Sequence, residues 1–146
     1  MIIKIDYYIA GFIGFFTGIF LIPTFVNLGI RDRVILLLLP LVLPPLWIFG
    51  LWLGNFLARW FAFFRQFARF AIVGFLNAAI DFGILNLLSA LTGITAGFII
   101  GGVNVPGFSL AVINSYFWNK LWVFRDRDEK NIFGDFYFGN YHPLTL

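Results

Sequence analysis

Four long apolar stretches dominate the chain, and short polar segments separate them. Residues 7–28 and 34–57 contain no charged side chain, residues 70–91 contain only Asp81, and a fourth stretch covers about residues 95–118. A helix needs roughly 20 apolar residues to cross a bilayer. The pattern therefore predicts an all-α membrane protein with four transmembrane helices in two hairpins, the first joined by a tight Arg31-Asp32-Arg33 turn.

The composition excludes most other classes of protein. Hydrophobic residues make up 61% of the 146 positions and charged residues 12%, against about 45–50% and about 25% in soluble domains. The chain has no cysteine, and its one histidine, His142, lies in the terminal tail. A disulfide framework and a thiolate metal site are therefore excluded. We expect no enzyme activity, no catalytic residue, no metal, no cofactor and no nucleic-acid partner.

The basic residues predict the orientation in the membrane. Eight of the ten Lys and Arg residues fall on the side of the two termini, whereas Arg31 and Arg33 fall on the opposite side. Cytoplasmic loops carry such an excess. We therefore expect a multi-pass protein of the cytoplasmic membrane with both termini in the cytoplasm. It divides into a hairpin over residues 1–66, a hairpin over residues 67–125 and a cytoplasmic or interfacial tail over residues 126–146.

Two stretches interrupt regular helix patterns. The second span carries Pro40, Pro44 and Pro45, which predicts either a bent structural helix or a hinge beside a cavity. The fourth span carries a Gly-Gly and a Pro-Gly pair within residues 101–107. There we expect either a kink in one long span or a short re-entrant piece followed by a second helix, as in transporters with broken helices.

Small residues and a faint repeat concern the packing of the helices. GxxxG patterns start at Gly14, Gly50 and Gly97, and such patterns favour close helix contacts in membranes. The pair Gly14-Phe15 also recurs one hairpin later as Gly74-Phe75. The repeat is compatible with a weak internal duplication, which many transporter folds contain.

Asp81 is the strongest candidate for a functional residue. An Asp at the centre of a membrane helix costs about 2.5–3.5 kcal/mol and normally faces protein or a water-filled path. Asn77 and Gly74 lie on the same helical face. This polar stripe is either a binding site or a hydrogen-bonded seam that fixes helix packing.

A second polar cluster closes the fourth span. It contains Asn114, Asn119, Lys120 and Arg125 around Trp122. Tryptophan with Lys or Arg is typical of an anchor at the membrane surface. Alternatively, Lys120 and Arg125, with Arg69 across the hairpin, bind the phosphate of an anionic lipid headgroup.

The polar stripe and the closing cluster together resemble the GtrA-like family. The opening RFAIVGFLNAAIDFG over residues 69–83 and the closing NSYFWNKLWVFR over residues 114–125 carry the resemblance, which covers about residues 67–125. The family usually has Arg at the position of Lys120 and places this hairpin first. Its members are small four-helix membrane proteins implicated in moving polyprenyl-phosphate-linked sugars across the cytoplasmic membrane for cell-surface polysaccharides.

The resemblance implies a function and a binding site. The expected function is flipping of a polyprenyl-phosphate-linked sugar, by a chain that contacts membrane lipid and forms homo-oligomers. The expected binding residues are Arg69, Asn77, Asp81, Asn114, Asn119, Lys120 and Arg125. Two alternatives remain open: a membrane subunit that anchors or stabilises a glycosyltransferase without transporting, and a small proton-coupled exporter that uses Asp81.

Overall fold

A computed structural model describes residues 4–96 and 99–124 of the chain. It contains helices α1 (Lys4–Asn27), α2 (Arg33–Leu57), α3 (Phe63–Thr92) and α4 (Ile99–Trp118), and a π-helix, η1 (Asn119–Val123), that continues α4. Each of the four long segments has the length and apolar character to cross a membrane. The predicted all-α membrane fold is confirmed, although α3 begins earlier than residue 70 and so includes Arg69.

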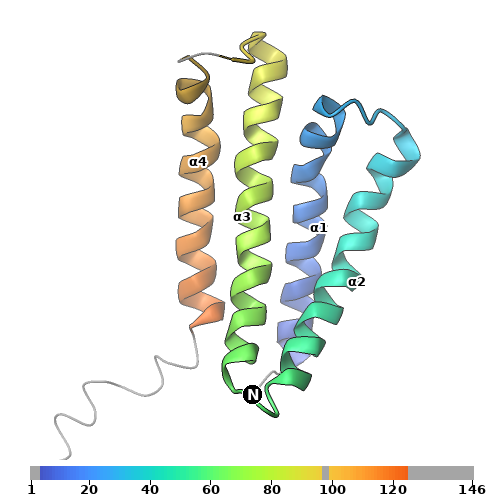
Figure 1. The fold of residues 1–146 in the computed structure, drawn as a ribbon, viewed down its shortest axis with the longest axis vertical. Coiled ribbons are helices and arrows are strands. Elements are labelled where there is room, and N and C mark those ends of the chain that lie inside the picture. The colour runs from blue at the N-terminus through green and yellow to red at the C-terminus, as the bar shows by residue number, and fades with distance from the viewer. Residues whose placement is uncertain (1–3, 97–98, 125–146) are drawn as a thin grey trace, which may run out of the picture.

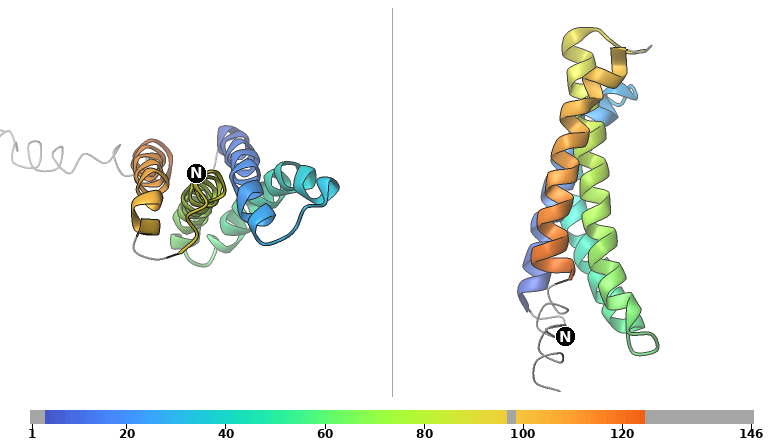
Figure 2. Two further views of the ribbon diagram at one scale, coloured as in Figure 1. Left: turned by 90° about the horizontal axis from the view of Figure 1, so that it is seen from above. Right: turned by 90° about the vertical axis from the view of Figure 1, so that its left-hand side faces the viewer.

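The helices form two hairpins that lie side by side. Figure 1 shows the order α4, α3, α1, α2 across the molecule, and Figure 2 shows from above that α3 is the central helix. Within the described residues α3 packs against α1, α2 and α4, whereas the backbone of α4 approaches only α3 and η1. The second hairpin therefore joins the rest of the protein mainly through α3.

Local backbone chemistry sets the two turns at one end of the bundle. Gly29 follows α1 with a φ of 89°, a left-handed conformation that favours glycine. Asp32 then caps α2, because its carboxylate accepts a hydrogen bond of 2.8 Å from the backbone N–H of Val34. Gly93, with a φ of 73°, ends α3 in the same left-handed way. The predicted tight turn around Asp32 is confirmed.

The prolines of α2 pack directly against glycines of α1. A Cβ built on Gly14 would lie 2.7 Å from the Cα of Pro44, and one built on Gly18 would overlap the backbone of Pro40. The two glycines therefore let the α2 backbone approach α1 at the points where proline removes a helix hydrogen bond. The indole N–H of Trp47 also donates to Thr17 Oγ1 at 3.3 Å. This geometry favours a structural role for Pro40 and Pro44 over a hinge.

Helix α4 runs without interruption from Ile99 to Trp118, so of the two alternatives for residues 101–107 the structure favours one long span over a re-entrant piece (Figure 1). An unbroken helix satisfies its own backbone groups, and a membrane favours that arrangement. The Pro-Gly pair instead serves packing: a Cβ on Gly107 would lie 2.8 Å from the carbonyl oxygen of Asp81. Gly107 therefore allows close contact between α4 and α3.

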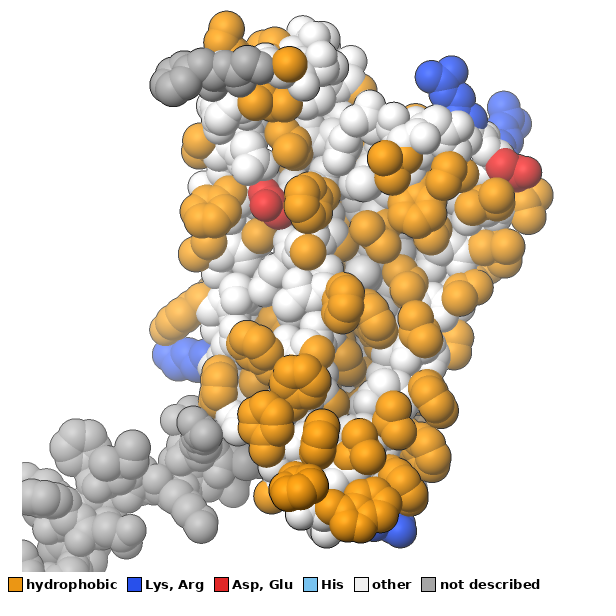
Figure 3. Space-filling view, viewed as in Figure 1, with side chains coloured by type: hydrophobic (Ala, Val, Ile, Leu, Met, Phe, Trp, Pro, Cys, Tyr) orange, Lys and Arg blue, Asp and Glu red, His pale blue; other side chains and the backbone are white. Residues whose placement is uncertain are grey.

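The outer surface is apolar. Large hydrophobic side chains cover the face in Figure 3, while charged groups gather toward the ends of the helices. The buried core is small and lies mainly where α1, α2 and α3 meet, around Ile13, Leu51 and Leu76. Such an exterior suits contact with lipid chains, which are as apolar as the side chains themselves.

Gly14→Ala is expected to destabilise the first hairpin, because its methyl group would meet the Pro44 backbone. Overpacking of this kind costs about 1–3 kcal/mol. Gly101→Ala is the matched control, since a Cβ there meets nothing within 4 Å. Thermal unfolding in detergent should give a lower midpoint for Gly14→Ala than for Gly101→Ala. Equal midpoints for the two variants would contradict the packing shown.

Candidate functional site

A buried ion pair and a hydrogen bond to it join three segments at the end of the bundle where α1 begins and η1 ends. The Arg69 guanidinium of α3 donates to Asp6 Oδ2 of α1 at 2.9 Å, and these side chains are 1% and 0% exposed. Trp122 of η1 donates its indole N–H to Asp6 Oδ1 at 2.8 Å. Asp6 therefore holds the first hairpin, α3 and the end of the fourth span together.

The π-helix aims Trp122 at this carboxylate. The backbone N–H of Phe124 donates to the carbonyl of Asn119 at 2.9 Å, five residues back, so the turn is wider than an α-helical one. Trp122 and Val123 are buried in the core as a result, and Trp122 packs against Trp118 with ring centroids 6.2 Å apart. The motif that closes the fourth span therefore contributes the buried Trp122 side chain to the core of the fold.

The ion pair changes the interpretation of Arg69. The sequence suggests Arg69 as a contact for a lipid phosphate, but the side chain is buried and its charge is balanced by Asp6. Sequence reasoning did not single out Asp6. The sequence feature that points to Asp6 is a carboxylate in the first turn of an apolar helix. Such a charge requires a partner inside the protein.

The predicted polar stripe of α3 faces α4. Asn114 donates to Asn77 Oδ1 at 2.7 Å, which forms one interhelical hydrogen bond. Asp81 lies against Gly107 of α4, where a Cβ would be 3.3 Å from Asp81 Oδ1. The structure therefore brings Asn77, Asp81 and Asn114 together at the contact between α3 and α4. This contact is called the α3–α4 seam below.

A hollow of about 290 Å³ opens along the seam, and Asn77, Asp81 and Ser115 contribute polar groups to its lining. Within the described part of the chain, three buried side-chain oxygens have no hydrogen-bond partner: Asp81 Oδ1 on the seam, Asn104 Oδ1 on α4 and Asn119 Oδ1 at the start of η1. Figure 3 shows acidic surface between α4 and α3 on an otherwise apolar face. The seam thus offers a carboxylate oxygen that lacks a hydrogen-bond donor.

The same face of α3 leads toward the end that carries the ion pair. Phe70 and Gly74 precede Asn77 at helical spacing, and Gly74 has open space where a Cβ would stand. A second hollow, of about 310 Å³, follows there between α3 and Phe124, with Gln66 as its polar lining. The two hollows therefore lie along one side of α3.

The remaining predicted residues lie in the first half of η1 or outside the described residues. Asn119 donates to Ser115 Oγ at 3.0 Å, and Ser115 in turn lines the hollow of the seam. Lys120 is exposed and donates to the Tyr116 hydroxyl at 3.2 Å. Arg125 lies outside the described residues, as does His142. Lys120 is exposed, whereas Arg69 is buried against Asp6, so the two suggested phosphate contacts lie in different surroundings.

Metal-ligating side chains do not cluster in the part of the chain that the structure describes. No three His, Cys, Asp or Glu side chains there come close enough to hold a metal ion. The described site consists instead of amide, hydroxyl and carboxylate groups on two adjacent membrane helices. Such a site suits hydrogen bonding to a ligand.

Four membrane-crossing helices with polar groups at an interhelical seam define a small multi-pass membrane protein. Residues 69–142, about half of the chain, match the family model described as the GtrA/DPMS transmembrane domain. The chain belongs to this family. The match begins at Arg69 of the ion pair and continues through residues that the sequence assigns to the tail. Neither the curated proteins nor the solved structures gave a match to the chain.

Asp6→Ala should destabilise the fold strongly, because it leaves the Arg69 charge buried without its partner. Removal of one member of a buried pair costs about 3–5 kcal/mol. The double variant Asp6→Ala/Arg69→Met should lose much less than the single variants Asp6→Ala and Arg69→Met lose when their losses are added, since no charge is then left uncompensated. Thermal unfolding of all four proteins in detergent measures this coupling, and additive losses would rule it out.

Proposed function

We propose that the protein flips a polyprenyl-phosphate-linked sugar across the membrane for the synthesis of a cell-surface polysaccharide. The observation that carries this proposal is Asp81 Oδ1, a buried carboxylate oxygen on the α3–α4 seam that has no hydrogen-bond partner. Membership of the GtrA/DPMS family fits a role in handling sugars linked to a carrier lipid.

The chemistry of the seam fits a sugar better than a phosphate. Sugar hydroxyls donate hydrogen bonds, and a carboxylate accepts the strongest of them. A phosphate carries acceptor oxygens and negative charge, so Asp81 would repel it. In this proposal the sugar lies in the hollow beside Asp81, Asn77 and Ser115. Its hydroxyl groups supply the hydrogen bonds that water would give to these side chains outside the membrane.

The phosphate would then remain near the membrane surface. Lys120 directly follows Asn119 at the end of the seam, and its flexible ammonium is exposed. A lysine contacts phosphate as a mobile point charge, which suits a headgroup that arrives and leaves. Arg125 is proposed as a second contact, whereas Arg69 acts by holding Asp6 and the fold in place.

The proposal includes an orientation and partners. The excess of Lys and Arg at the end with Lys120 supports a cytoplasmic position for this end. The seam faces the membrane on its open side, so a second copy of the chain would enclose the sugar path more fully. The protein changes no covalent bond in this scheme, and a glycosyltransferase would supply or consume the carried sugar.

A scrambling assay with reconstituted vesicles tests the function. The probe is a fluorescent polyprenyl-phospho-sugar, and its accessibility to a membrane-impermeant quencher reports flipping. Asp81→Asn should slow flipping by about tenfold, which corresponds to 1.4 kcal/mol, because an amide accepts more weakly than a carboxylate. Asp32→Asn is the matched control, since Asp32 lies in the exposed turn and asparagine preserves the cap.

The other outcomes distinguish the alternatives. Flipping that is equally fast in Asp81→Asn would remove the seam from the mechanism. An inactive wild-type protein whose addition instead activates a glycosyltransferase would favour the membrane-subunit hypothesis. Transport of lipophilic cations that depends on pH and on Asp81 would favour the exporter.

A further inference from the structure

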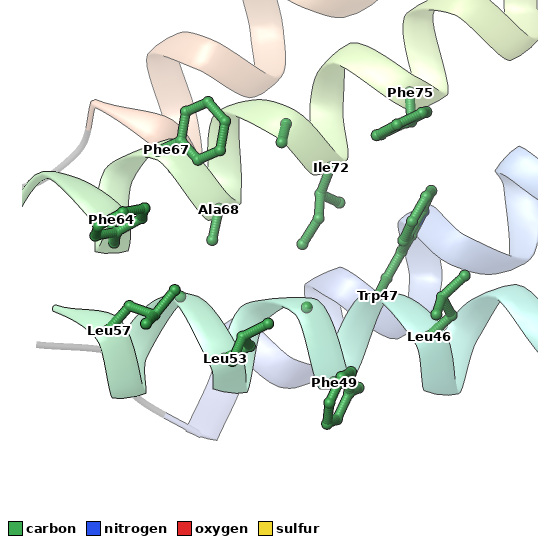
Figure 4. Close-up of a pocket in the computed structure, with 13 residues that line it drawn as sticks. Leu46, Trp47, Phe49, Leu53, Leu57, Phe64, Phe67, Ala68, Ile72 and Phe75 are labelled. Carbon is green, nitrogen blue, oxygen red and sulfur yellow. The ribbon is translucent and has the colours of Figure 1, made fainter.

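A second, entirely apolar groove lies on the other side of α3. It occupies about 330 Å³ between α2 and α3, and none of its lining side chains is charged or carries a hydroxyl, carboxyl or amide group. Figure 4 shows Leu53 and Leu57 of α2 opposite Ala68 and Ile72 of α3, with Trp47 reaching toward Phe75 at one end. The rings of Trp47 and Phe75 lie 5.2 Å apart and close that end.

Glycine creates the space in this groove. A Cβ on Gly50 would meet no atom within 4 Å, so the missing side chain leaves room on the α2 wall. Gly54, one turn further on, instead touches Ala68 and keeps the two helices in contact. Between Leu46 and Leu57 the α2 wall extends for about 16 Å along the helix. The groove is therefore long, narrow and held open by the packing of its own walls.

We propose that this groove binds the isoprenoid chain of the carrier lipid whose sugar occupies the α3–α4 seam. The inference rests on the proposed function and adds a separate binding subsite to it. Its basis is continuity: Phe67 lines both the apolar groove and the hollow at the foot of the seam. A lipid can therefore have its headgroup on one side of Phe67 and its chain on the other.

The walls suit an isoprenoid chain more than a straight acyl chain. Leaving the bilayer for a groove brings no hydrophobic gain, because lipid tails are as apolar as the protein. Selectivity must therefore come from van der Waals fit. Aromatic faces from Trp47, Phe64 and Phe75 border a gap that a missing side chain widens at Gly50. Methyl branches fill such a widened gap, and flat double bonds stack against rings.

Photo-crosslinking with a sugar-free probe tests this subsite. The probe is a polyprenyl phosphate with a diazirine in its chain, incorporated with the full-length protein in phosphatidylcholine vesicles. Mass spectrometry should locate the crosslinks on residues 46–57 and 64–75. Gly50→Leu fills the open space and should reduce labelling by about fivefold through lost contacts. Gly102→Leu is the matched control, because its Cβ also meets nothing within 4 Å but lies on α4.

The outcomes separate this inference from the proposed function. Equal labelling in Gly50→Leu and Gly102→Leu, or equal labelling by a diazirine phosphatidic acid, would overturn the isoprenoid subsite. Asp81→Asn should leave labelling by the sugar-free probe unchanged, because Asp81 lies outside the groove. Crosslinks in the groove without any flipping would support the subsite and count against transport. Flipping that depends on Asp81, without crosslinks in the groove, would support transport and overturn the isoprenoid subsite.

Discussion

The buried charge of Asp6 is the constraint on which the rest of the structure depends. An ionised carboxylate inside a membrane protein needs both an opposite charge and further hydrogen bonds. Arg69 supplies the charge and the Trp122 indole supplies a hydrogen bond, so α1, α3 and η1 must meet at one point. The π-helix accompanies this requirement, since its wide turn brings Trp122 into the core. The end of the fourth span is thereby fixed to the first hairpin.

Close contacts between helix backbones hold the rest of the bundle together. Gly14 and Gly18 admit the prolines of α2, Gly83 admits the backbone of α1, and Gly107 admits α3. Without a hydrophobic driving force between helices in lipid, such contacts and interhelical hydrogen bonds hold a bundle together. Hydrogen bonds from Asn86 to Thr24 and between Asn86 and Asn27 add to the joint of α1 and α3 at the other end. Three helices thus form a tightly tied unit that carries α4 along one side.

The sequence predicted the spans and the polar stripe well because these features are local. Length and hydropathy decide whether a helix crosses a membrane, and the spacing of Asn77 and Asp81 places them on one face. The Asp6–Arg69 pair could not be found in this way, because its members are 63 residues apart. The sequence left open whether the fourth span breaks at residues 101–107, because the low helix preference of glycine and proline there opposes the need to satisfy the backbone in lipid. Packing against α3 also favours an unbroken helix, because Gly107 allows the α3 backbone to approach α4.

The position of α4 at the edge of the bundle has a consequence for access to the seam. Within the described residues the backbone of α4 approaches only α3 and its own continuation η1, so the seam lies at the side of the bundle and opens toward the bilayer. A ligand with a membrane anchor reaches such an opening by diffusing in two dimensions, and its effective concentration is set by its fraction of the lipids. Occupancy would then follow the composition of the membrane more closely than the concentration of any solute in water.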